Sequence, residues 1–167
     1  LAPSEMCIRE RTKVVGMTKP RLITIANQKG GVGKTTSTVN LAAAMAAAGK
    51  KVLVIDLDPQ GNASTAVGAE HRTGTPSSYE VLLGDKSAEE AMQQSEFTDS
   101  LFCIPATIDL AGAEIEMVSL VRREFRLYDA LHNGFLKENG FEYVFIDCPP
   151  SLGLLTINAM TCAEEVI

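Results

Sequence analysis

The amino-acid sequence predicts an α/β fold in which helices cover both faces of a parallel sheet. Apolar runs that suit strands alternate with helical segments along the chain, and this order is typical of parallel sheets. The runs at 52–56 and 143–147 are apolar up to a final acid, as expected of strands buried on both faces. A glycine-rich turn leads from the first strand directly into the first helix.

Each element of the first half has a local signal. The alanine-rich first helix stops at Gly49, because glycine readily adopts the left-handed backbone of a C-terminal cap. The segment after the second strand is rich in Gly, Ser, Thr, Pro and Asn, which predicts a loop. The predicted order is a strand over 21–27, a helix over 34–48, a strand over 52–55 followed by Asp56, and a loop over 57–78.

In the second half, polar and breaker residues mark the boundaries. Pro105 ends a short apolar strand, and Asp109 is expected to cap the helix that follows. A long helix ends near Gly140, and Pro149-Pro150 forces a turn. The predicted elements are short helices over 78–84 and 87–94, a strand over 101–104, helices over 109–120 and 122–138, a strand over 143–147, a helix over 152–161 and a strand beginning at 164.

Composition indicates one globular domain. The chain has 167 residues, of which 46% are hydrophobic and 22% are charged, so it is long enough to bury a core. Its longest apolar stretch, 41–48, is too short to span a bilayer, and no N-terminal segment has the order of a signal peptide. The net charge of −6 argues against broad non-specific nucleic-acid binding by this stretch.

The cysteines are scattered and form no Cys-x-x-Cys pair. We expect reduced, mostly buried thiols rather than disulfides or a metal site, which predicts a cytosolic protein. The residues concerned are Cys7, Cys103, Cys148 and Cys162.

The two ends of the sequence lie outside the regular pattern. Residues 1–16 are unpatterned, and we interpret them as a disordered upstream extension or an expression remnant, with Met17 as the natural start. Residues 164–167 are expected to be a strand cut off as it begins. Residues 17–167 are therefore predicted to form an incomplete domain.

The most informative segment is Lys29–Thr36, which reads Lys-Gly-Gly-Val-Gly-Lys-Thr-Thr. Where a strand turns into a helix, backbone N–H groups hold phosphate oxygens, and glycines let the backbone come close. Lys34 is predicted to reach the β- and γ-phosphates of a nucleotide, and the Thr35 hydroxyl to bind Mg²⁺. The predicted phosphate-binding residues are Lys29, Gly30, Gly31, Val32, Gly33, Lys34, Thr35 and Thr36.

This segment departs from the ordinary Walker A pattern. Gln28 stands where that pattern has glycine, and a second lysine, Lys29, lies inside the loop. A lysine so close to a bound triphosphate is expected to do more than contact solvent. The alternative interpretation is a glycine-rich turn that binds no ligand.

Three predicted strands end in polar or acidic residues, Asn27, Asp56 and Asp147, at the edge where ligands bind in open α/β sheets. Asp147 matches the Walker B pattern and is predicted to contact Mg²⁺ through water. Asp56 and Asp58 project to the same side if the strand continues, so that one attends the metal while the other orients an attacking water. Pro59 and Gly61 are expected to shape a loop that moves with the γ-phosphate state. The alternatives are a solvated acid at a strand end and a turn rich in Asp, Pro and Asn.

Three motifs in this order resemble those of the deviant Walker A ATPases, and within them the ParA or Soj group that partitions chromosomes and plasmids. They are Lys29–Thr36, Asp56–Asn62 and Ile146–Ser151. The resemblance extends over residues 21–167. It implies a P-loop NTPase-type fold, incomplete at the C-terminal side, that binds ATP and Mg²⁺ and hydrolyses ATP slowly.

The resemblance also implies a role for each site residue. Lys29 is similar to the signature lysine that reaches across a dimer to the partner's nucleotide and supplies transition-state charge. Asp58 matches the acid that positions the attacking water, and Asp56 is placed near the metal. The implied catalytic residues are Lys29, Lys34 and Asp58; the metal residues are Thr35, Asp56 and Asp147; the switch residues are Pro59, Gln60, Gly61, Asn62, Pro149, Pro150 and Ser151.

The implied partners follow from the same resemblance. Such proteins form ATP-dependent homodimers and bind DNA non-specifically through a C-terminal part that lies beyond the position of Ile167. A centromere-binding ParB-type protein stimulates their hydrolysis. The implied location is cytoplasmic and associated with the nucleoid, without membrane contact.

Other interpretations stay open. One is a MinD-like or other cargo-positioning ATPase, and another is an electron-transfer reductase of the nitrogenase iron-protein type, which needs paired cysteines. A third is an inactive truncated fragment or dimerisation module. The basic cluster of Arg122, Arg123 and Arg126 is interpreted as a solvated helix face or as a contact for DNA or ParB.

Overall fold

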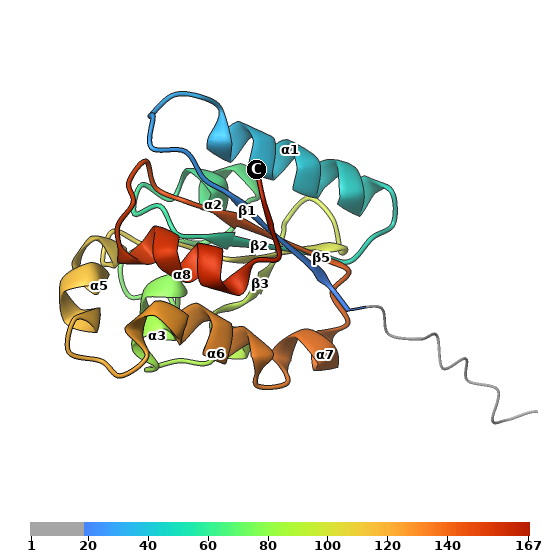
Figure 1. Ribbon diagram of the computed structural model, residues 1–167. Coiled ribbons are helices and arrows are strands. Elements are labelled where there is room, and N and C mark those ends of the chain that lie inside the picture. The colour runs from blue at the N-terminus through green and yellow to red at the C-terminus, as the bar shows by residue number, and fades with distance from the viewer. Residues whose placement is uncertain (1–18) are drawn as a thin grey trace, which may run out of the picture.

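The computed structural model describes residues 19–167, so the predictions about 1–16, Met17 and Cys7 lie outside the described residues. Six strands form one sheet in the order β3-β4-β2-β5-β1-β6 (Figure 1). All neighbouring strands in it run parallel except β3 and β4, which are antiparallel. The strands are β1 (Arg21–Ile25), β2 (Val52–Asp56), β3 (Gln93–Gln94), β4 (Leu101–Ile104), β5 (Tyr143–Asp147) and β6 (Glu165–Val166).

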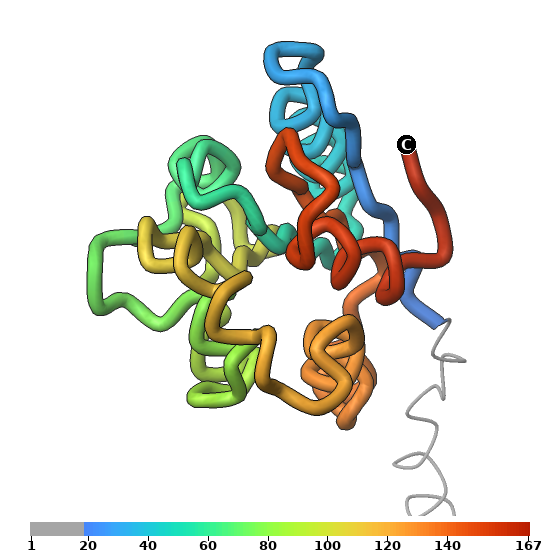
Figure 2. Tube along the Cα trace, turned by 60° about the vertical axis from the view of Figure 1, so that its left-hand side comes forward, coloured from blue at the N-terminus to red at the C-terminus, as the bar shows by residue number. Residues whose placement is uncertain are grey.

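The helices divide between the two faces of this sheet, as Figures 1 and 2 show. One buried cluster joins the sheet to α1 and α2, and a larger one joins it to the helices of the other face. The two helices of the first face are α1 (Lys34–Ala47) and α2 (Asn62–Ala66). The helices of the second face are α3 (Ser78–Leu83), α4 (Ala88–Ala91), α5 (Leu110–Met117), the 3₁₀ turn η1 (Arg123–Phe125), α6 (Arg126–His132), α7 (Phe135–Asn139) and α8 (Leu154–Cys162).

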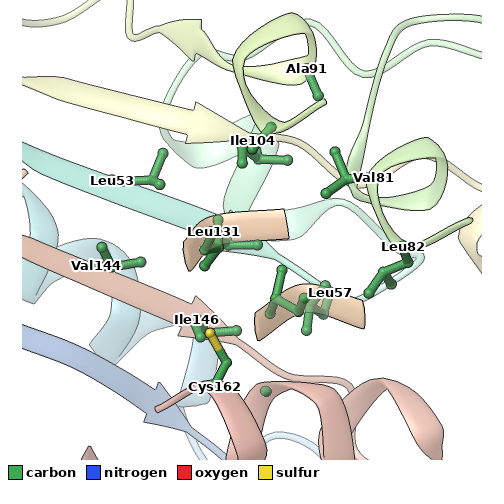
Figure 3. Close-up of a cluster of buried hydrophobic side chains, with 14 of the residues drawn as sticks. Leu53, Leu57, Val81, Leu82, Ala91, Ile104, Leu131, Val144, Ile146 and Cys162 are labelled. Carbon is green, nitrogen blue, oxygen red and sulfur yellow. The ribbon is translucent and has the colours of Figure 1, made fainter. Parts of the chain in front are cut away.

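The central strands are buried on both faces, as predicted. Along β2, Val52 and Val54 belong to the smaller cluster, whereas Leu53 and Ile55 belong to the larger one. Figure 3 shows Leu53 among the strand and helix side chains of the larger cluster. The sheet is therefore enclosed between two layers of helices, and its strand ends carry the polar residues.

Strand register brings the predicted acids together. β5 lies between β1 and β2, and Asp147 pairs with Ile25 on one side and with Asp56 on the other. The glycine-rich loop leaves β1 at the same edge. Three segments that are distant in the sequence therefore meet at the carboxyl ends of neighbouring strands.

The predicted loop over 57–78 is wrong in part, because α2 occupies Asn62–Ala66. This helix begins after Gly61, whose φ of +63° suits glycine. Its second buried residue, Ser64, donates two hydrogen bonds to Asp56 at the end of β2. The α2 helix is therefore held by a contact with β2, and the composition of residues 57–78 alone cannot predict that contact.

Two helices end earlier than predicted. The helix predicted over 87–94 stops at Ala91, and Gln93–Gln94 pairs antiparallel with β4, so the sheet is mixed rather than wholly parallel. The helix predicted to reach 120 ends at Met117, and the side chain of Asp109 makes no capping bond to it.

The single helix predicted over 122–138 is also wrong. The segment divides into η1, α6 and α7, and the break between the last two lies at Gly134, with φ of +120°. A helix cannot continue through that backbone conformation. Smaller differences are that β1 ends at Ile25 instead of 27, and that the last helix covers Leu154–Cys162 instead of 152–161.

Three cysteines are free and buried, as predicted: Cys103, Cys148 and Cys162. Burial raises the pKa of both the Cys148 and the Cys162 thiols to about 12, so they stay protonated at neutral pH. Within residues 19–167, no helix has the length and apolar character needed to cross a membrane.

Candidate functional site

The glycine-rich loop runs from the end of β1 to the start of α1. Gly31 and Gly33 have φ of +71° and +91°, which disfavour any residue with a side chain. Ser37 N–H donates to the Gly33 carbonyl at 2.8 Å, so Gly33 is the N-cap from which α1 starts. A Cβ at Gly30 would meet no atom of residues 19–167 outside its chain neighbours, and the φ of Gly30 is not left-handed. Neither packing nor backbone strain within the described chain explains Gly30, which is the pattern expected where a ligand approaches the backbone.

The two lysines of the loop lie in different settings. Lys34 is the first residue of α1, and its Nζ donates to the Lys29 carbonyl at 3.1 Å, which bends the loop over the helix start. Lys29 is exposed, and its backbone N–H donates to Asn27 Oδ1 at 3.0 Å. The structure thus presents one cation at the helix N-terminus and a second, exposed one within the loop.

Asp147 connects the end of β5 to α1. Its Oδ2 accepts from the Thr35 hydroxyl at 2.7 Å, and its Oδ1 accepts from the Thr38 hydroxyl at 3.0 Å. Burial raises the pKa of the Asp147 carboxyl above its ordinary value; the two hydroxyls and the charge of Lys34 oppose that rise, and the charge of Asp58 adds to it. The predicted Walker B acid therefore lies directly against α1, the helix that follows the glycine-rich loop.

Asp56 is fully buried and is held by its own loop. Its Oδ2 accepts from the backbone N–H and the hydroxyl of Ser64, at 2.8 and 2.7 Å, and its Oδ1 accepts from the Asp58 N–H at 3.0 Å. Burial raises the pKa of the Asp56 carboxyl to about 6 despite these bonds, and the nearby charge of Asp147 adds to the rise. Both carboxylate oxygens are thus engaged by the protein.

Asp58 shapes the first predicted switch segment, residues 59–62, which follows it directly. Its Oδ1 accepts from the Gln60 N–H at 3.0 Å and its carbonyl accepts from the Gly61 N–H at 2.9 Å. A Cβ at Gly61 would lie 2.8 Å from Nδ1 of His71 and 3.1 Å from the Ala106 carbonyl. Pro59 is half-buried in this turn and Asn62 opens α2. Close packing and positive φ together require glycine at 61.

The second predicted switch segment, residues 149–151, lies in the connection from β5 to α8. Pro149 is buried, whereas Pro150 and Ser151 are exposed. Ser151 N–H donates to the Pro149 carbonyl at 2.8 Å, and the Ser151 carbonyl accepts from the Thr156 hydroxyl at 2.8 Å. These bonds fold the segment into a tight turn. That either segment switches with nucleotide state stays a prediction.

The residues present fit a Mg²⁺ ion beside a triphosphate. Mg²⁺ prefers oxygen ligands, and the Thr35 hydroxyl and Asp147 carboxylate supply them 2.7 Å apart at the start of α1. Asp56 lies in the neighbouring strand, but its oxygens already accept three hydrogen bonds. Its predicted place near the metal therefore stays a prediction, while its contacts define a role in shaping the loop that carries Asp58.

Sequence reasoning missed three polar residues that support this site. Thr38 lies three residues after Thr35 in α1, so helical spacing alone places both on one face toward Asp147. Ser64 and Ser78 carry no such signal: Ser64 bonds Asp56 only because α2 forms, and Ser78 Oγ donates to the Asp56 carbonyl at 2.8 Å from α3.

The basic cluster in the second half is largely engaged by the protein itself. Arg126 donates to the carbonyls of Leu82 and Leu83 at 2.8 Å each, at the C-terminal end of α3. Arg122 pairs with Asp129 at 2.8 Å, and Arg123 with Glu124 at 2.9 Å. This basic cluster is therefore a poorer candidate for contact with DNA or a partner protein than the sequence alone indicates.

Comparison with known proteins adds to this geometry. The family model described as an AAA domain matches residues 20–167. The chromosome partitioning protein ParA of Myxococcus xanthus strain DK1622 is 48% identical over 147 residues, which cover 88% of this chain and 50% of the relative. The sporulation initiation inhibitor protein Soj of Bacillus subtilis strain 168 is 49% identical, over 88% of this chain and 56% of the relative. The chain thus spans about half the length of the curated relatives it matches.

A solved structure shows the same fold with ligands bound. The crystal structure of cobyrinic acid a,c-diamide synthase from Mycobacterium smegmatis, with bound ATP analog and magnesium, matches with a TM-score of 0.80 and 42% identity. The match covers 89% of this chain and 59% of that one.

Proposed function

This chain belongs to the AAA domain family, and from that premise we propose that it is the nucleotide-binding part of a ParA-type partitioning ATPase. The observation that carries the proposal is the bond between Thr35 and Asp147, which joins the phosphate loop to the end of β5. The relatives named ParA and Soj, at 48% and 49% identity, favour partitioning over the MinD-like alternative.

The proposed roles follow from the site geometry. Backbone N–H groups of residues 30–36 and the Lys34 ammonium bind the phosphates of ATP, because the start of α1 and both lysines favour an anion there. Thr35 and Asp147 hold Mg²⁺, which when bound neutralises charge on the phosphates. Asp58, in the turn after β2, accepts a hydrogen bond from the water that attacks the γ-phosphate.

Lys29 is proposed to act in a dimer. Lys29 is exposed, which leaves its side chain able to reach a nucleotide bound to a second copy. There its charge would stabilise the transition state as an arginine finger does. An ATP-dependent homodimer with slow hydrolysis, accelerated by a ParB-type partner, is part of the same proposal.

DNA binding and location complete the proposal. The net charge of this chain is −6, which opposes attraction to DNA, so non-specific DNA binding is assigned to the half of the relatives' length that this chain does not match. A cytoplasmic, nucleoid-associated location would follow from that DNA binding.

Calorimetric titration of the chain with Mg²⁺·ATP tests the proposal. We expect binding by the wild-type chain and its loss in Lys34→Ala, because the loop then lacks its helix-end cation. Lys137→Ala, which removes an exposed lysine in α7, is the matched control and should bind normally. Equal binding by Lys34→Ala and wild type would overturn the proposed site. A folded wild-type chain that binds no nucleotide would leave the inactive-fragment interpretation in its place.

A further inference from the structure

A carboxylate from a neighbouring helix holds the start of the helix that follows the second switch segment. Glu114 lies in α5, and its Oε1 accepts from the backbone N–H of Leu155 in the first turn of α8 at 3.1 Å. We propose that Glu114 is a positioning residue that fixes the connection between the second switch segment, residues 149–151, and α8, and this rests on the proposed function for the meaning of that segment.

The bond replaces a cap that α8 lacks. The first N–H groups of a helix have no partner within it, and a side chain at the N-cap usually supplies one. The N-cap of α8 is Gly153, which has no side chain to do so. Glu114 provides both the missing acceptor and a negative charge at the positive end of the helix dipole.

The glycine at 153 is explained by the same contact. Its φ of −75° and ψ of −173° are open to any residue, so the backbone does not require glycine. A Cβ at this position would overlap the Glu114 carboxylate. Gly153 therefore gives Glu114 the room to reach the helix, and the pair acts as one unit.

The contact between Glu114 and α8 connects the two predicted switch segments. The second switch segment is fixed at one end by Asp147 and at the other by the Glu114–Gly153 pair. The α5 helix follows β4 and the loop in which Ala106 N–H donates to Ser64 Oγ at 3.0 Å, and Ser64 bonds Asp56. Glu114 is thus in a position to hold the second switch relative to the loop that packs on the first.

Amide hydrogen exchange of α8 tests this directly in the 167-residue chain. In Glu114→Ala we expect the Leu155 amide to exchange about fivefold faster, the effect of losing one ordinary hydrogen bond. Gly153→Ala should give the same acceleration, because its methyl group displaces the carboxylate. The double variant should match either single variant, since both remove one interaction. Glu114→Gln should restore most of the protection, because its amide oxygen accepts the same bond although the negative charge at the helix end is lost.

Glu116→Ala is the matched control, because Glu116 lies in the same helix but bonds Tyr79 of α3. It should leave Leu155 exchange unchanged. Exchange within twofold of wild type in both Glu114→Ala and Gly153→Ala would overturn the proposal, and so would additive effects in the double variant.

Nucleotide turnover supplies a second readout. Glu114→Ala should lower kcat for ATP hydrolysis about fivefold or more while leaving KM within twofold, because Lys34 and Thr35 are untouched. Glu114→Gln should recover kcat. An equal loss in Glu116→Ala, or a change in KM alone, would contradict positioning. Absence of turnover in the wild-type chain would count against the proposed function, and the exchange measurement would still decide the role of Glu114.

Discussion

The two buried aspartates at neighbouring strand ends differ in what they hold. Asp147, at the end of β5, accepts from two hydroxyls of α1, next to the glycine-rich loop. Asp56, one strand away and paired with it in register, accepts from two backbone N–H groups and one hydroxyl of the segment that follows β2. Both are fully buried, and burial raises the pKa of both carboxyls.

This difference indicates that Asp147 is available for ligand binding, whereas Asp56 stabilises the loop after β2. Hydroxyl groups can rotate toward other partners, so the contacts of Asp147 can be exchanged for a ligand at small cost. Backbone N–H groups of a folded turn cannot rotate, so Asp56 is fixed by the loop and fixes it in return. Substitutions at the β2 end should therefore act mainly on stability, and those at the β5 end mainly on nucleotide binding.

The largest stability effect is expected at Asp56. Asp56→Ala should lower the free energy of unfolding by about 3–4 kcal/mol, because the N–H groups of Ser64 and Asp58 lose their buried acceptor; relief of the buried charge offsets part of the loss. Asp147→Ala should cost only about 1 kcal/mol, since its partners are hydroxyls. Urea unfolding of both variants measures the contrast, and equal losses would remove the proposed distinction.

The pH dependence of stability sharpens the same contrast. The pKa of Asp56 is about 6 in the fold against an ordinary 3.8, so the folded state binds the proton more tightly than the unfolded state does. This contribution is fully present below about pH 4 and is lost as pH rises through 6, amounting to at most about 3 kcal/mol. The stability advantage of the wild type over Asp56→Asn should shrink across this window. Parallel curves for the two proteins would show that Asp56 does not titrate as described.

The sequence predicts the β5 end better than the β2 end, for physical reasons. The strand over 143–147, the acid at its end and the glycine loop are local signals, and the structure places them together. The α2 helix in the predicted loop depends on Ser64 meeting Asp56, eight residues earlier in sequence but in another element. Gly134 is a local signal for a helix break, because glycine readily adopts positive φ. The apolar residues on both sides of it nevertheless favour one continuous helix, and this led to the wrong prediction over 122–138.

The contact between Thr38 and Asp147 tests how much stability the β5 end contributes. Thr38→Val keeps the shape of the side chain but removes a buried hydroxyl that bonds Asp147 at 3.0 Å and the Lys34 carbonyl at 3.0 Å. We expect a loss of about 1 kcal/mol in unfolding free energy, no larger than that of Asp147→Ala, because Asp147 keeps its bond from Thr35. Thr35→Val is the matched control: it should cost less stability, being half-buried, but should abolish the Mg²⁺ dependence of ATP binding. The reverse order of the two stability losses would contradict the assignment.

The smallest stability effect is expected at Gly30, and it is the most selective test of the phosphate loop. A Cβ there meets no atom of the described chain, and the backbone is not left-handed, so Gly30→Ala should change the free energy of unfolding by no more than about 0.5 kcal/mol. The same methyl group would stand where the backbone approaches the phosphates, so ATP affinity should fall about tenfold or more. Gly112→Ala, at a helical glycine in α5 where a Cβ would meet only the flexible Glu116 side chain, with Oε1 at 3.3 Å, is the control for both measurements. A Gly30→Ala variant that unfolds more easily but binds ATP normally would show that Gly30 contributes to stability and not to nucleotide binding. The exposed loop would then resemble the β2 end, where substitutions act mainly on stability.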